Sequence, residues 1–110
     1  MLGSGAVIVM DESVCMVKVT HRALKFFEHE SCGKCTPCRE GTEWLRKVLG
    51  RLENGQGREG DIELLVDVAG VMNGRTFCPL GDGAAGVVTG MIKYFRNEFE
   101  EHIKTKKCNF

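Results

Sequence analysis

Long apolar runs and net charge are both scarce in this sequence, and each scarcity argues against a class of protein. The longest uninterrupted apolar stretch, Ala6 to Met10, is far shorter than the roughly 20 residues that cross a bilayer, so direct membrane insertion is not expected. Fifteen basic residues balance fifteen acidic ones, which leaves no overall field to attract nucleic acid or an anionic membrane. The N-terminus has no basic start, long apolar segment or small-residue cleavage site, so a reducing compartment is expected.

The apolar content sets the size and class of the fold. With 110 residues and 43% apolar composition, the chain can build one compact domain with a modest core. Neither an internal repeat nor a low-complexity tract is present. The sequence therefore predicts a single domain.

Apolar residues recur at helical spacing in four segments, which predicts a mainly α fold. The expected helices run from caps at Asp11–Ser13 to about His29, from about Glu40 to Leu52, from an Asp61 cap to an Asn73–Gly74 stop, and from near Asp82 into a lysine-rich tail. Residues 3–10 instead indicate a short β-like run with no strand to pair against. Four helices around one core is the simplest arrangement.

Cysteine is the residue type that carries chemistry here. Cys32, Cys35 and Cys38 form C-x2-C-x2-C, a spacing with which one curled loop can direct three thiolates at one small inorganic cube. Cys78 is the natural fourth ligand, because it lies in a second loop and is followed by Pro79, like the Cys-Pro pair of bacterial ferredoxins. Both prolines of the chain adjoin these cysteines, where they restrict the loop backbone. The pattern predicts a [4Fe–4S] cluster held by the four predicted ligands, Cys32, Cys35, Cys38 and Cys78.

The cysteine pattern has three alternative interpretations, namely a zinc site, disulfide bonds and a substrate-binding cluster. Structural zinc sites usually come as two separated pairs of ligands, whereas this pattern is three plus one, so a zinc-binding interaction module is the alternative function. Three close cysteines cannot pair into disulfides without leaving one over. A free-standing enzyme with substrate at an open iron is disfavoured by the fourth cysteine. Three basic residues, Lys34, Arg39 and Arg75, adjoin the ligand loops. We interpret them as solvated surface charges in preference to groups that stabilise the reduced cluster.

The remaining chemistry-bearing residues are expected to be structural. Cys15 and Cys108 have no neighbouring cysteine and are predicted to be free thiols. His21 and His102 are predicted on helix surfaces, and Trp44 in the core. No catalytic residue is predicted.

Four segments resemble one known family. GSGAVIVMDES, HESCGKCTPCREGTEWL, FCPLGDGAAG and IKYFRNEFEEHI are similar to the carboxy-terminal part of the NADH-oxidising, flavin-bearing subunit of respiratory complex I. Related subunits of NAD-linked hydrogenases and formate dehydrogenases share these motifs. The resemblance runs nearly end to end along the chain.

The resemblance implies an electron-transfer module of an NADH:quinone oxidoreductase-type complex. In this family Cys32, Cys35, Cys38 and Cys78 ligate a [4Fe–4S] cluster, which receives electrons from reduced FMN and passes them to the next iron–sulfur centre. FMN and NAD are expected only in an upstream domain that is not part of this sequence, so the chain is not expected to oxidise NADH by itself. The implied location is the cytoplasmic or matrix-side peripheral arm of a membrane-associated complex, with other iron–sulfur subunits as partners.

These expectations combine into one domain plan. The fold class is mainly α, a four-helix bundle-like domain with a short N-terminal β remnant and two cluster-binding loops. Residues 1–12 are the remnant of a preceding β domain, residues 13–103 the helical cluster-binding domain, and residues 104–110 a basic tail.

Overall fold

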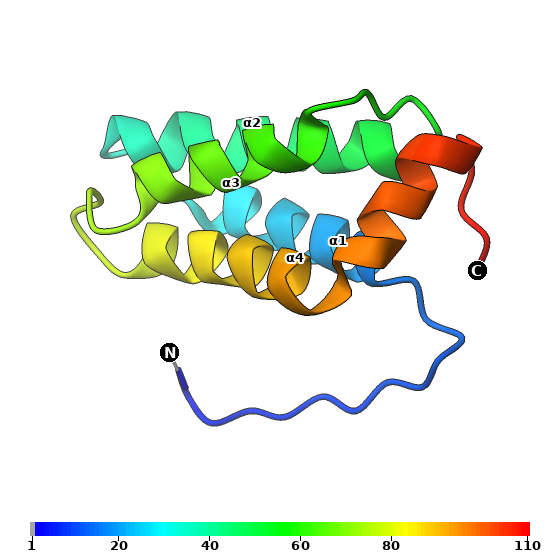
Figure 1. Ribbon diagram of the computed structural model, residues 1–110. Helices are drawn as coiled ribbons and strands as arrows, with labels where there is room; N and C mark the ends of the chain where they lie inside the picture. Colours follow the sequence, from blue (N-terminus) through cyan, green and yellow to red (C-terminus); the bar gives the residue numbers. More distant parts are fainter. Residues whose placement is uncertain (1) are drawn as a thin grey trace.

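Four helices form the frame of the protein. The computed structural model describes residues 2–110, and its elements are α1 (Met16–Glu30), α2 (Thr36–Glu53), α3 (Asp61–Met72) and α4 (Leu80–Thr105). Figure 1 shows α1 and α2 as one antiparallel pair and α3 with the first part of α4 as another. The predicted mainly α, four-helix fold is confirmed. None of these helices is long and apolar enough to span a membrane.

The N-terminal segment lies outside the bundle. Residues 2–12 form an extended arm, and no strand forms anywhere in residues 2–110. The apolar side chains of Val7, Ile8 and Val9 are 77–90% exposed. The β-like run therefore has no pairing partner within the described chain, and its origin in a preceding β domain stays a prediction.

The first helix begins later than its sequence signals indicated. The Asp11–Ser13 segment forms a local turn, in which the Ser13 backbone N–H donates to Asp11 Oδ1 at 3.0 Å. Cys15 is the residue that caps α1, because its sulfur accepts a hydrogen bond from the Lys18 backbone N–H at 3.4 Å. The predicted Asp11–Ser13 cap is thus wrong, since those polar side chains are used within their own turn.

The second helix begins earlier than expected, at Thr36 rather than near Glu40. Pro37 accounts for the difference, because the missing N–H and fixed φ of proline suit the first turn of a helix. Cys38 therefore lies in the first turn of α2 and not in an irregular loop.

Glycine conformations set the ends of α3. Gly60 precedes the helix with φ of +90°, so Asp61 is its first residue and not its cap. Gly74, with φ of +74°, follows its end, as the Asn73–Gly74 signal predicted. The fourth helix begins at Leu80, two residues before the predicted Asp82, and bends at Phe95, whose φ of −127° and ψ of +27° are not helical.

Apolar side chains from all four helices meet in one core. Its fully buried members include Val17, Leu24, Leu45, Leu49, Leu52, Leu65, Ala69, Ala84, Val88 and Phe99.

Three aromatic or histidine predictions are wrong. Trp44, in the middle of α2, is 53% exposed, whereas His21 and His102 are buried. The buried ring of His21 pairs with Glu53 at the end of α2, which satisfies one of its nitrogens.

The C-terminal tail turns back onto the bundle. Lys106 has φ of +57°, which reverses the chain directly after α4. Its ammonium group bonds the carbonyl oxygen of Gly57, and its own carbonyl lies against Gly55. The turn that links α2 and α3 thus holds the end of α4 and the residues that follow.

Candidate metal centre

The two cysteine-bearing loops lie at the same end of the bundle. Alternate antiparallel helices bring together the C-terminal end of α1, the start of α2, the end of α3 and the start of α4, as Figure 1 shows. Residues 31–35 connect the first pair and residues 73–79 the second. All four predicted ligands are free cysteines, with Cys32 and Cys78 exposed, Cys35 half-buried and Cys38 buried.

Hydrogen bonds fix the shape of the first cysteine loop. Gly33 adopts φ of +76°, which allows the tight turn between Cys32 and Cys35. The guanidinium of Arg39 folds back to donate to the Gly33 carbonyl oxygen at 2.8 Å and to Thr36 Oγ1 at 3.3 Å. Arg39 is therefore more than the solvated surface charge that the sequence suggested, because it ties the loop to the first turn of α2.

Cys38 is held on two sides. Its carbonyl oxygen accepts a hydrogen bond from Thr42 Oγ1 at 2.7 Å, and its sulfur lies 3.2 Å from Ser31 Oγ. Because the Gly33 backbone N–H points at the same Ser31 oxygen at 3.4 Å, the hydroxyl hydrogen is free to be donated to the Cys38 sulfur. A donor at this sulfur suits a thiolate ligand.

The second loop is tied to the start of α4. The backbone N–H of Gly74 donates to Asp82 Oδ1 at 2.8 Å, and Thr76 Oγ1 donates to the Cys78 carbonyl oxygen at 2.7 Å. Gly81 packs so closely against Thr76 that a Cβ there would lie 2.3 Å from its methyl carbon. The basic side chain of Arg75 turns away to bond the last carbonyl oxygens of α3, those of Gly70 and Val71.

The first turns of α2 and α4 offer backbone donors to an anionic group, although the C-terminal ends of α1 and α3 lie at the same end of the bundle. The first backbone N–H groups of a helix have no acceptor within the helix, and they form the positive end of its dipole. Neither α2 nor α4 has a side chain capping its N-terminus, and both begin at the cysteine end. Four thiolates around an iron–sulfur cube carry net negative charge, so this donor set and its surroundings fit a [4Fe–4S] cluster.

A different group of ligating atoms lies at the opposite end and escaped sequence reasoning. Within residues 2–110, the sulfurs of Cys15 and Cys108 and a ring nitrogen of His102 all lie within 4.8 Å of one another. Both cysteines are free thiols, as predicted, and they lie close together. The one available signal was the H-x5-C spacing of His102 and Cys108, which becomes meaningful only once the tail is known to fold back.

A helical frame with four free cysteines in two neighbouring loops and the adjoining first turn of α2 has the thiol donor set of an iron–sulfur-binding domain. Residues 18–102 match the family described as the NADH-ubiquinone oxidoreductase-F iron-sulfur binding region. The chain belongs to this family, whose cofactor is a [4Fe–4S] cluster.

Known proteins support the same assignment. The whole chain is 54% identical to an NADH-quinone oxidoreductase F subunit of Rhizobium meliloti (strain 1021), covering 26% of that protein. It is 50% identical to the NADH-quinone oxidoreductase F subunit of Streptomyces coelicolor, of which it covers 24%. The crystal structure of an NAD+-reducing [NiFe]-hydrogenase in the H2-reduced state superposes on 86% of the chain with a TM-score of 0.81 and 34% identity, covering 16% of that chain. The chain spans about a quarter of the length of the curated relatives it matches.

Proposed function

We propose that this chain is the cluster-bearing domain of an NADH-oxidising subunit and that Cys32, Cys35, Cys38 and Cys78 are the cluster ligands. It relays electrons one at a time from reduced FMN in an upstream domain to the next iron–sulfur centre of an NADH:quinone oxidoreductase-type complex. The bound cluster supplies the one-electron chemistry, and the chain supplies ligand geometry, hydrogen bonds and a docking surface. FMN and NAD would bind outside this sequence.

The observation that carries the proposal is the convergence of both cysteine loops on one end of the bundle, beside two uncapped helix N-termini. Three ligands come from one loop and the first turn of α2, and the fourth comes from the loop before α4. Cys32 and Cys78 are both exposed, which supports a centre close to the protein surface. A relay needs such a position, because its donor and acceptor belong to other domains.

An apolar surface beside the cysteines supports partner docking. A groove of about 300 Å³ runs between the start of α2 and the end of α3, and Pro37, Trp44 and Val71 line it. Phe77, next to Cys78, is 79% exposed. Exposed apolar patches of this kind mark interaction sites. We infer that this surface contacts the upstream flavin domain or another iron–sulfur subunit within a peripheral arm.

Iron and sulfide analysis of the anaerobically reconstituted protein tests the assignment. We expect four iron and four sulfide per chain, a brown colour, and an EPR signal after dithionite reduction. Cys78→Ser should lose most of the iron, whereas Cys108→Ser at the opposite end should keep all of it. Comparing these two variants separates ligand loss from the general effect of removing a thiol.

A colourless protein that holds zinc on the four predicted ligands would contradict this proposal and support the interaction-module alternative. An intact cluster in Cys78→Ser would refute the assignment of Cys78 as a ligand, but not the presence of the cluster. The membership of the chain in an iron–sulfur-binding family favours iron.

A further inference from the structure

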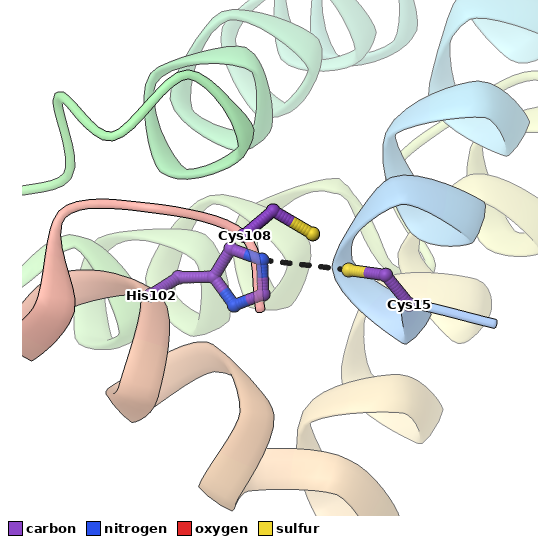
Figure 2. Close-up of side chains that lie close together, drawn as sticks. All are labelled: Cys15, His102 and Cys108. Atoms are coloured by element: carbon purple, nitrogen blue, oxygen red, sulfur yellow. Dashed lines mark hydrogen bonds between the residues drawn. The ribbon is translucent and has the colours of Figure 1, made fainter. Parts of the chain in front are cut away.

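The opposite end of the bundle carries a second group of metal-ligating side chains, drawn in Figure 2. Cys15 comes from the start of α1, His102 from the last turns of α4, and Cys108 from the tail beyond it. Figure 2 shows the two thiols and the imidazole pointing toward one another. Cys15 and His102 are 3% and 1% exposed, and Cys108 is half-buried.

We propose that Cys15, His102 and Cys108 form a second metal site, which binds one Zn²⁺ ion with a water molecule in the fourth position. Two thiolates and one neutral imidazole balance the charge of the dication. They are also ligand types that zinc prefers.

The separation between His102 and Cys15 fits a shared cation. With zinc bonds of about 2.3 Å to sulfur and 2.0 Å to nitrogen at tetrahedral angles, a nitrogen–sulfur pair should lie about 3.5 Å apart. His102 Nε2 lies 3.4 Å from the Cys15 sulfur. The sulfur of Cys108 lies within 4.8 Å of both atoms, so a small movement of the tail completes the set.

The imidazole is oriented as a metal ligand requires. His102 Nδ1 lies 2.7 Å from the Glu98 carbonyl oxygen, which can only accept, so this nitrogen carries the hydrogen. The lone pair of a neutral ring is then on Nε2, which faces Cys15. Ligating histidines usually have such a partner on their other nitrogen.

The C-terminal tail that carries Cys108 is held against the bundle by hydrogen bonds. Lys106 reverses the chain with φ of +57° and bonds the Gly57 carbonyl, and the Asn109 side-chain amide donates to Glu101 Oε1 at 2.9 Å. These contacts on both sides of Cys108 return its thiol to the bundle.

A route for the ion is also present. A cavity of about 820 Å³ is lined by Cys15 and Cys108 and bounded by the N-terminal arm and α1. It gives water and a cation access to the two sulfurs. Zn²⁺ binds cysteine as the thiolate, so ligation releases the thiol protons to solvent without any redox change.

Metal analysis of the cluster-loaded chain tests the proposal. After incubation with zinc sulfate and desalting without oxygen, we expect one zinc per chain in addition to the cluster iron. Cys108→Ser should lose this zinc while its iron content and EPR signal stay unchanged. A variant with serine at all four predicted cluster ligands should keep one zinc and bind no iron, which excludes zinc capture by empty cluster cysteines.

A spectroscopic probe checks the ligands, and folding is checked separately. Co²⁺ in the same four-serine variant should give an intense sulfur-to-cobalt charge-transfer band, and adding Cys108→Ser should abolish it. Because Cys108 lies in the tail, its variant should keep the helical circular dichroism of the parent. Zinc that persists in Cys108→Ser, no zinc in the four-serine variant, or a Cys15–Cys108 disulfide in place of metal would overturn the proposal.

Discussion

The hydroxyl oxygen of Ser31 lies 3.2 Å from the sulfur of Cys38, where the cysteine loop joins the first turn of α2. A hydrogen bond to a ligand sulfur stabilises the more negative, reduced form of an iron–sulfur centre.

Ser31→Ala should therefore lower the reduction potential. If the bond differs by about 1 kcal/mol between the oxidised and reduced states, the shift is about 40 mV for one electron. An EPR-monitored redox titration measures it, with Ser13→Ala at the opposite end of the bundle as the control. An unchanged potential in Ser31→Ala would show that the hydroxyl hydrogen is directed elsewhere.

Replacing the Arg39 guanidinium should loosen the cysteine loop. Arg39→Gln removes the donor that reaches the Gly33 carbonyl oxygen at 2.8 Å, so we expect faster loss of the cluster in air. Lys34→Gln, in the same loop, removes the same charge. Bleaching rates of the visible absorption compare them, and equal rates would mean that charge and not the hydrogen bonds of Arg39 protects the centre.

The buried carboxylate of Asp61 should matter for stability. It accepts from the Arg58 backbone N–H at 2.9 Å and pairs with Arg51, and its side chain is 5% exposed. Asp61→Ala should lower the free energy of unfolding by about 2 kcal/mol, because it leaves the half-exposed Arg51 without its partner. The exposed Glu63 in the same turn of α3 offers a matched control, and Glu63→Ala should change stability much less, because water already solvates its pair with Arg96. Similar thermal midpoints for the two variants would refute the prediction.

Gly55 should be intolerant of any side chain. Its φ is +74°, and a Cβ there would lie 2.1 Å from the Lys106 carbonyl oxygen, a backbone atom. Gly55→Ala should destabilise the protein by about 2 kcal/mol or more and displace the tail. Gly70→Ala, in α3 with nothing within 4 Å of the added carbon, should instead stabilise it by about 0.5–1 kcal/mol. Thermal unfolding followed by circular dichroism distinguishes the two, and a neutral Gly55→Ala would contradict the observed packing.

The number and type of helices could be predicted because apolar spacing depends on local sequence. Helix starts were less predictable, since the choice between Ser13 and Cys15 as the cap of α1 depends on which groups each residue meets in the folded chain. The three-plus-one cysteines could be recognised because three of them are close in sequence. The Cys15, His102 and Cys108 group could not, because 87 residues separate Cys15 from its histidine neighbour. The burial of His21 also depends on a distant partner, Glu53.

The length of α4 separates the two ends of the molecule. Going from Leu80 to His102 along this helix, through the bend at Phe95, follows roughly 33 Å of helix path at about 1.5 Å per residue, and the longest dimension of the chain is 38 Å. At physiological salt, electrostatic interactions through solvent decay over about 8 Å. Charge added or removed at one end is therefore screened from the other, and the effects of substitutions at the two ends should be additive. Substitutions that change the chemistry at one end, in evolution or in the laboratory, should therefore leave the electrostatic environment of the other end unchanged.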